Sequence, residues 1–208
     1  DDQAIFKWAG ADVDSFIALK EEVDHVNTLD QSYRIPGGPI HELSQNIIKN
    51  VSNRYSKEYR PRQELGDLTR YTDVTQVDMS QGQWLVLSSA NHFLDDIKDL
   101  CELQGWYYAH KHRNSIKLDL LLAIQTWEKW RKHEKISQTP RIILSTIHAA
   151  KGGEADNVLV LPDITKSAAD HDDINPDELH RLFYVAVTRA KKSLHILEPR
   201  SYERSYVL

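Results

Sequence analysis

The chain has 208 residues, of which 40% are hydrophobic and 27% charged, a balance typical of a globular domain that buries its own core. Its formal net charge of −5 excludes a domain that binds nucleic acid through overall positive charge, so such binding needs a local basic or aromatic patch. The single cysteine, Cys101, excludes an internal disulfide framework. No stretch has the apolar length of a membrane span or the pattern of a signal peptide, so we expect an intracellular, cytoplasmic protein.

Short elements and polar segments alternate in the first part of the chain. Residues 12–22 are expected to form a short helix with Asp12 as its N-cap, and residues 25–29 a strand. An amphipathic helix is predicted over residues 40–52, because its apolar residues recur on one face. The polar, turn-rich segment 56–83 is expected to be a long loop or a small irregular insert, mostly solvated.

The rest of the chain alternates short apolar runs with helical patterns. Strands are predicted at residues 84–87, 106–109, 141–145, 158–161 and 193–197. Helices are predicted from Phe93 to the stop signal Gly105, at residues 116–131 and at residues 178–190. Because the strands alternate with helices and are apolar throughout, we expect an α/β fold with a mostly parallel sheet covered on both faces.

Three clusters of basic, aromatic or polar side chains lie at the ends of these elements. They are Tyr33 with Arg34, then Thr146, His148, Lys151 and Glu154 around the adjacent glycines 152 and 153, and Thr188 with Arg189. Ligands of an open parallel sheet bind beyond the carboxyl ends of its strands. Arginine presents a planar fork to phosphate oxygens, and adjacent glycines let the backbone approach a ligand closely. The pattern therefore predicts a site for a polyanion such as a nucleoside triphosphate.

Four long segments carry a resemblance to a known family. In chain order they are "DDQAIFKWAGAD" (1–12), "TLDQSYR" (28–34), "STIHAAKGGEADNVLV" (145–160) and "ELHRLFYVAVTRAKKSL" (178–194). They resemble motifs III, IV, V and VI of the UvrD/Rep-type superfamily 1 DNA helicases. The resemblance implies a RecA-like, three-layer parallel sheet. It also implies that residues 1–23 are the end of a first RecA-like domain and residues 24–208 the second one, with a reduced insert around 53–83.

The resemblance implies a role for each matching position. The expected catalytic residues at the γ-phosphate are Gln3, Arg34 and Arg189. The expected ATP-binding residues are Tyr33, which stacks on adenine, Glu154 near the ribose, and Gly152 in the same loop. The expected DNA-binding residues are Trp8, which stacks on an unpaired base, and Thr146 and His148, which face the DNA backbone. Arg181 matches a motif VI arginine with a structural or coupling role.

The sequence lacks the G-x-x-x-x-G-K-[ST] phosphate loop and a Walker B acidic pair. By resemblance, both belong to the first RecA-like domain, which would hold most of the Mg²⁺, and no metal site is expected in this chain. The implied parent protein is an ATP-dependent DNA helicase that moves on single-stranded DNA, 3′ to 5′, and unwinds duplex. Its expected partners are single-stranded and duplex DNA, ATP and its own first domain, but not a membrane. This fragment alone should not hydrolyse ATP.

Other interpretations stay open at this point. The chain could be the motor part of a helicase-nuclease subunit, or a non-catalytic helicase-like domain that binds DNA or protein. Trp8 could be a core aromatic, His148 a structural histidine, and Arg189 part of a plain salt bridge. Lys191 and Lys192 are expected only to favour the C-terminal end of the helix at 178–190. The remaining tryptophans, 84, 106, 127 and 130, are assigned to packing.

Overall fold

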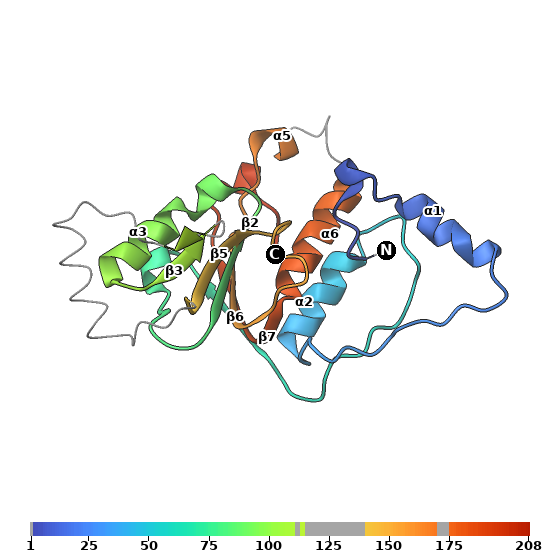
Figure 1. The fold of residues 1–208 in the computed structure, drawn as a ribbon, viewed down its shortest axis with the longest axis horizontal. Coiled ribbons are helices and arrows are strands. Elements are labelled where there is room, and N and C mark those ends of the chain that lie inside the picture. The colour runs from blue at the N-terminus through green and yellow to red at the C-terminus, as the bar shows by residue number, and fades with distance from the viewer. Residues whose placement is uncertain (1, 111–112, 115–139, 170–174) are drawn as a thin grey trace.

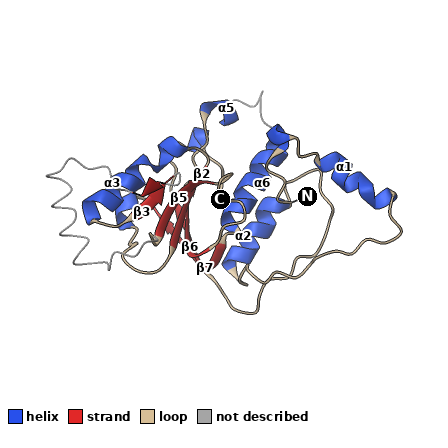
Figure 2. Cartoon of the chain, viewed as in Figure 1, coloured by secondary structure: helices blue, strands red, loops and turns tan. Residues whose placement is uncertain are grey.

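The computed structural model describes residues 2–110, 113–114, 140–169 and 175–208. A central sheet has helices α2 and α6 on one side and α3 on the other (Figure 1), while α1 lies apart from the sheet, beyond α2 and α6. Figure 2 shows the same arrangement by element type, and loops connect most of the neighbouring elements. The fold is therefore the predicted α/β architecture with helices on both faces.

The strands described form a seven-stranded sheet in the order β1-β7-β6-β2-β5-β3-β4. All neighbouring pairs are parallel except β3 and β4, which are antiparallel. The strands are β1 (Asp67–Tyr71), β2 (Trp84–Ser88), β3 (Tyr108–His110), β4 (Arg113–Asn114), β5 (Ile142–Thr146), β6 (Ala155–Val160) and β7 (Ala190–Leu197). Such a sheet needs helical crossovers, which the sequence supplies between its apolar runs.

The α-helices are α1 (Val13–Ala18), α2 (Pro39–Ile48), α3 (Asp95–Gln104), α5 (Lys166–Ala169) and α6 (Pro176–Val187). Short 3₁₀ helices are η1 (Lys7–Ala9), η2 (Leu19–Glu21), η3 (Val74–Gln76), η4 (Asn91–Leu94) and η5 (Tyr202–Arg204). Their ends follow local rules. The Asp12 carboxylate caps α1 as expected, and α3 ends at Gly105 in the left-handed conformation.

Strand β2 shows how both faces of the sheet are buried, since all five of its residues are buried. Leu85 and Leu87 join the core beneath α2 and α6, whereas Trp84 and Val86 join the core beneath α3. Alternate side chains of a strand point to opposite faces. A strand that is apolar at every position is therefore one covered on both sides, as predicted.

Three sequence predictions differ from the structure or lie outside it. Residues 25–29 form no strand, because the described chain offers them no strand to pair with, and Val26 and Leu29 are exposed. The supposed loop 56–83 contains β1, an edge strand whose polar sequence hid it from an apolar search. The helix predicted at 116–131, with tryptophans 127 and 130, falls outside the described residues.

Candidate functional site

Arg189, two residues after the end of α6, is a buried cation that forms no ion pair with the described part of the chain. Only 1% of the residue is exposed. Its Nε donates to the carbonyl oxygen of Val185 at 2.9 Å, and its Nη2 to Thr188 Oγ1 at 3.1 Å and to Gln3 Oε1 at 3.4 Å. All three acceptors are neutral, and no carboxylate among the described residues forms an ion pair with this guanidinium. Burial and the nearby charge of Arg34 lower the pKa of Arg189 to about 10, so it stays charged near pH 7.

Arg34 lies beside Arg189, although the two are far apart in the sequence. Its Nε donates to the carbonyl oxygen of Thr188 at 2.8 Å. Its own turn is held by the Ser32 hydroxyl, which accepts from the backbone of Arg34 at 3.2 Å and of Ile35 at 2.8 Å. Two guanidinium groups are therefore anchored around the end of α6. Like charges in one place repel each other unless an anion lies between them.

Glu154 completes this group on the side of Arg34. Its carboxylate lies 3.9 Å from Arg34 Nη1 and 3.6 Å from Lys191 Nζ, and Lys191 also lies 3.9 Å from Asp156. Lys192 pairs with Asp156 at 2.7 Å. The expectation that both lysines serve only the end of a helix is wrong, because α6 ends at Val187 and they lie in β7, where they pair with acidic side chains of the neighbouring strand and its approach.

The position of the site relative to the sheet also differs from the expectation. Arg189 and Glu154 immediately precede β7 and β6, so they lie at the amino ends of these strands. Thr146, in contrast, is the last residue of β5, at the carboxyl end. The connection from β5 to β6 runs back along the sheet between these two edges. The expectation that these residues lie beyond the carboxyl ends of strands is therefore wrong for Glu154 and Arg189.

Tyr33 and Gly152 are open to solvent at the periphery of this group. Tyr33 is 87% exposed, which leaves its ring available for stacking. Gly152 has a φ of 92°, a left-handed conformation that favours glycine, and a side chain at this position would meet no atom within 4 Å. The backbone conformation therefore favours glycine at position 152, whereas close packing against the rest of the described chain does not.

The residues predicted to face DNA lie in a shallow, open hollow. Phe6, Thr146, His148 and Lys151 line it together with Ala149. The ring centroids of Phe6 and His148 are 6.0 Å apart, and Lys151 Nζ lies 5.0 Å from the Phe6 centroid. Burial lowers the pKa of His148, so the imidazole is neutral at pH 7. The backbone of Trp8 lies in η1, and its side chain lies outside what the structure describes.

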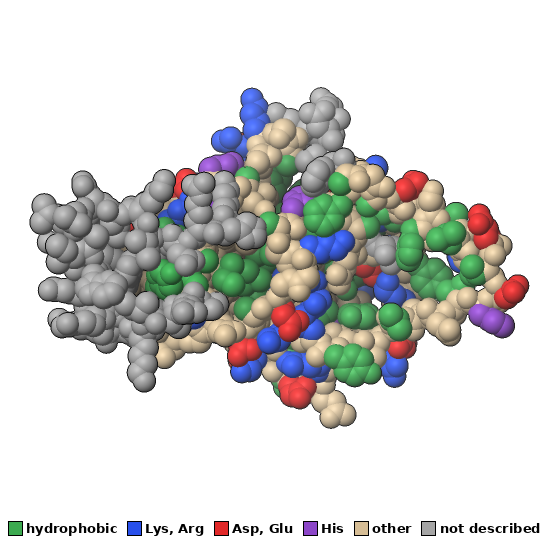
Figure 3. Space-filling view, viewed as in Figure 1, with side chains coloured by type: hydrophobic (Ala, Val, Ile, Leu, Met, Phe, Trp, Pro, Cys, Tyr) green, Lys and Arg blue, Asp and Glu red, His purple; other side chains and the backbone are tan. Residues whose placement is uncertain are grey.

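The structure thus groups the predicted residues into two sets. Gln3, Arg34, Glu154 and Arg189 form one, and Thr146 and His148 the other, while their individual roles stay predictions. Sequence reasoning missed Phe6, although its place in the motif III segment, two positions before Trp8, was a usable signal. In the view of Figure 3, lysine and arginine side chains are interspersed with acidic ones near the centre of the molecule, so the basic side chains there do not form a patch of one sign.

Two kinds of feature, a metal-ion cluster and a membrane-spanning helix, are absent among the described residues. No group of three or more histidine, cysteine, aspartate or glutamate side chains is arranged to hold a metal ion within those residues. In the same part of the chain, none of the helices has the length and apolarity to cross a membrane.

The largely parallel sheet with helices on both faces defines a three-layer α/β domain. A sequence model described as the UvrD-like helicase C-terminal domain matches residues 3–200, so the chain belongs to that family. Among solved structures, it is similar to the C-terminal domain of a possible DNA helicase from Lactobacillus plantarum WCFS1, with 14% identity, 82% of this chain and 89% of that chain covered, and a TM-score of 0.47. It is also similar to the C-terminal part of the Fun30 ATPase domain, with 13% identity, coverage of 100% and 67%, and a TM-score of 0.32. No curated protein sequence matches it.

Proposed function

We propose that this chain is the second RecA-like lobe of an ATP-dependent DNA helicase, and that Arg34 and Arg189 contact the terminal phosphate of ATP. The observation that carries the proposal is the burial of Arg189 among neutral acceptors only. A buried charge is costly unless a counter-charge compensates it. A nucleotide phosphate held between two lobes would supply that counter-charge, and Arg34 would supply a second guanidinium from a separate loop.

The chemistry of phosphoryl transfer fits these residues. Charge on the oxygens of the transferred phosphoryl group is stabilised by positioned cations, and an arginine in this role is worth about 10³–10⁵ in rate. Gln3 lies within hydrogen-bonding reach of Arg189, so both can address one phosphate. Mg²⁺ and most phosphate contacts would come from the first lobe, since this chain lacks a phosphate loop. We therefore expect no ATP turnover from this chain alone.

The remaining site residues fit the other parts of a nucleotide. The exposed ring of Tyr33 is free to stack on an adenine. The Glu154 carboxylate, held between two cations, can accept hydrogen bonds from ribose hydroxyl groups. Gly152 lies in the same loop as Glu154, and its glycine keeps that loop free of a side chain.

The N-terminal part of the chain fits a contact with the first lobe. We propose that residues 1–23 belong to that lobe and that residues 24–208 form the second lobe, with a reduced insert around 53–83. Apolar side chains on and after α1 are exposed, although such residues usually form a core. They are Phe16, Leu19, Val23, Val26 and Leu29. Packing against the rest of the first lobe would bury this surface.

The open hollow with Phe6, Thr146, His148 and Lys151 is the proposed track for single-stranded DNA. An aromatic face with a neighbouring ammonium group binds bases and phosphates without regard to sequence. We propose that the cleft between the two lobes closes and opens on each ATP cycle. This movement would drive the protein 3′ to 5′ along single-stranded DNA, which passes the hollow and Trp8, and so unwind duplex. Trp8→Ala should weaken single-strand binding of the full-length protein by about 1–3 kcal/mol, and unchanged affinity in a fluorescence titration would count against stacking.

The nucleotide proposal is tested by ATP turnover of the full-length protein. Arg34→Ala and Arg189→Ala should each lower kcat by at least about 10²-fold. Lys192→Ala is the matched control, because its side chain is 69% exposed and, among the described residues, forms an ion pair only with Asp156. The proposal is wrong if either arginine variant stays within threefold of the control.

A further inference from the structure

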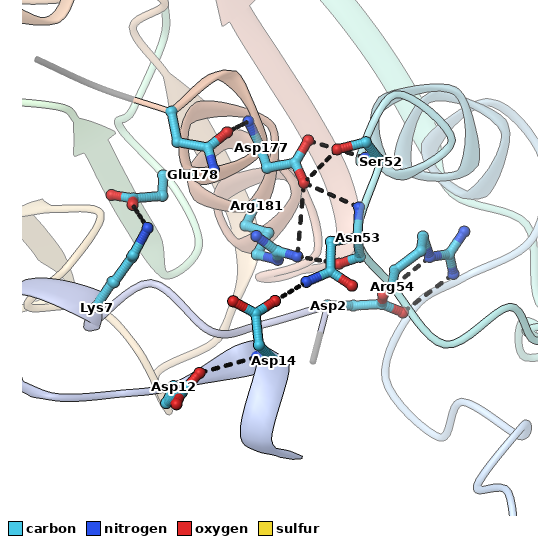
Figure 4. Close-up of polar contacts among 11 residues, drawn as sticks. Asp2, Lys7, Asp12, Asp14, Ser52, Asn53, Arg54, Asp177, Glu178 and Arg181 are labelled. Atoms are coloured by element: carbon cyan, nitrogen blue, oxygen red, sulfur yellow. Dashed lines mark hydrogen bonds and ion pairs between the residues drawn. The ribbon is translucent and has the colours of Figure 1, made fainter. Parts of the chain in front are cut away.

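A short loop that follows α2, Ser52–Arg54, contacts two other parts of the chain (Figure 4). These are residues 2–14, called the N-terminal segment below, and the N-terminal half of α6. None of the four recognised motifs includes this loop. It nevertheless connects the segment that carries Gln3 to α6, the helix that Arg189 follows. Its contacts divide into those that hold the loop to α6 and those that reach the N-terminal segment.

The loop is held to α6 by the buried carboxylate of Asp177. Asp177 accepts from the backbone of Ser52 at 2.8 Å, from the Ser52 hydroxyl at 2.9 Å and from the backbone of Asn53 at 3.0 Å. Asp177 itself is fixed at the start of α6, where its backbone donates to Asn175 Oδ1 at 3.0 Å. Arg181 closes the arrangement from the next turn of α6, since its guanidinium donates to the carbonyl oxygen of Asn53.

The same loop binds the N-terminal segment at two points, Asp2 and Asp14. Arg54 donates with Nε and Nη2 to the two carboxylate oxygens of Asp2, at 3.1 and 3.2 Å, and Lys57 lies 2.9 Å from the same carboxylate. Asp2 is 5% exposed. At the other end of the segment, the Asn53 side chain donates to Asp14. A bidentate arginine-carboxylate pair fixes orientation as well as distance.

The contacts of Asp2 with Arg54 and Lys57 help to fix the position of Gln3 in the proposed site, because Gln3 is the next residue. The hydrogen bond between Gln3 Oε1 and Arg189 Nη2 is long, at 3.4 Å. Hydrogen bonds at this length weaken steeply with further displacement. A small shift of Asp2 would therefore separate Gln3 from Arg189.

We propose that Arg54 is a positioning residue that orients Asp2 and thereby holds Gln3 against Arg189. Arg54 touches no proposed ligand and acts only through the N-terminal segment. The loop around it is a rigid base, since Asp177 and Arg181 tie it to the helix that presents Arg189. This inference rests on the proposed role of Gln3 in nucleotide turnover.

A double-mutant cycle in the full-length protein tests this role. The measured quantity is kcat for ATP in the presence of single-stranded DNA, for Gln3→Ala, Arg54→Ala and the double variant. Arg54→Ala should lower kcat about tenfold, and the double variant should lie within twofold of Gln3→Ala, because residues that act through one contact are not additive. Arg54→Lys, which keeps the charge, should recover part of the loss.

Arg60→Ala is the matched control. Arg60 also makes two bonds to one aspartate, Asp30, at 3.0 and 3.1 Å, but its side chain is 64% exposed and it does not contact the N-terminal segment. Its kcat should stay within twofold of the unmodified protein. If Arg54→Ala fails to fold, Asp2→Asn takes its place in the cycle with the same expectation.

The outcomes separate this inference from the function on which it rests. If Gln3→Ala alone leaves kcat within twofold, the proposed role of Gln3 is wrong. If Gln3→Ala lowers kcat but Arg54→Ala behaves like Arg60→Ala, only the positioning role is overturned. Losses that multiply in the double variant also overturn it, because they would mean that Arg54 supports the fold in general.

Discussion

Two arginines of one helix region, Arg181 and Arg189, are buried to nearly the same degree but in opposite electrostatic surroundings. Arg181 is 3% exposed and lies 4.0 Å from the Asp177 carboxylate. Arg189 is 1% exposed and donates only to neutral oxygens. The first has a carboxylate within 4.0 Å, whereas the second forms no ion pair among the described residues, and the Glu154 carboxylate favours its charge only from farther away. The charge of the partners, more than the degree of burial, therefore distinguishes the two arginines.

Substitution of Arg189 and of Arg181 by methionine tests whether the two arginines differ in their contribution to stability. Arg189→Met removes an uncompensated buried charge and fills most of its volume, so the free energy of unfolding should change by less than about 1 kcal/mol. Turnover of ATP by the full-length protein should still fall at least about 10²-fold. Urea unfolding and steady-state kinetics measure the two effects. A loss of stability as large as that at Arg181 would contradict the distinction.

Arg181→Met should have the opposite profile. It leaves Asp177 buried with hydrogen bonds but without a cation, and leaves the carbonyl oxygen of Asn53 without its donor. We expect the free energy of unfolding to fall by about 2–4 kcal/mol. Urea denaturation measures the change, and an unaltered midpoint would show that the Asp177 pair does not stabilise the fold.

Acid titration should sharpen the comparison at the Asp177 end. Burial opposes ionisation of Asp177, but the hydrogen bonds from Ser52 and Asn53 outweigh it, so its pKa is lowered. A lowered pKa in the folded state contributes stability that is complete above the unfolded value of about 3.9 and is lost as the pH falls through the folded value. The stability difference between the unmodified protein and Asp177→Asn should therefore be constant from about pH 7 to pH 5 and shrink below about pH 4. A constant difference at all pH values would contradict the assignment.

The smallest effect is expected from Lys7, which pairs with Glu178 near the same end of α6 at 3.4 Å. Their side chains are 60% and 33% exposed. Exposed pairs contribute about 0–1 kcal/mol and are screened by salt. Lys7→Ala should thus change the unfolding free energy by less than about 1 kcal/mol, and less still at high salt. A larger loss in urea unfolding would mean that this pair belongs with the buried contacts of the loop 52–54.

Sequence reasoning predicted those elements whose signal is local. Short apolar runs predicted β2, β5, β6 and the second half of β7. Strand β2 is buried at every position, as expected of a strand covered on both faces, whereas β5 and β7 also contain partly or fully exposed residues. Sequence reasoning missed β1, whose exposed, polar residues pair with β7 at the sheet edge. It wrongly predicted a strand at 25–29, because an apolar run indicates burial but does not supply a strand to pair with.

The site shows the same limit. Motif resemblance selected Arg34, Glu154 and Arg189, and the structure brings them together around Thr188. The contacts of the loop 52–54 were not predicted, because its partners Asp2 and Asp177 lie far from it along the chain and share no sequence pattern with it.

For this protein, the sequence by itself determined the alternation of strands and helices, the family and the residue types available for phosphate and DNA. Those properties follow from periodicity and from short motifs, which act within a few neighbouring residues. Only the tertiary structure decided that Arg181 lies beside a carboxylate, that Arg189 forms no ion pair with any described residue, and that Asp2 is held by Arg54. Charge pairing depends on distance in space between residues far apart in the chain, and that distance is established only when the sheet, α2 and α6 pack together.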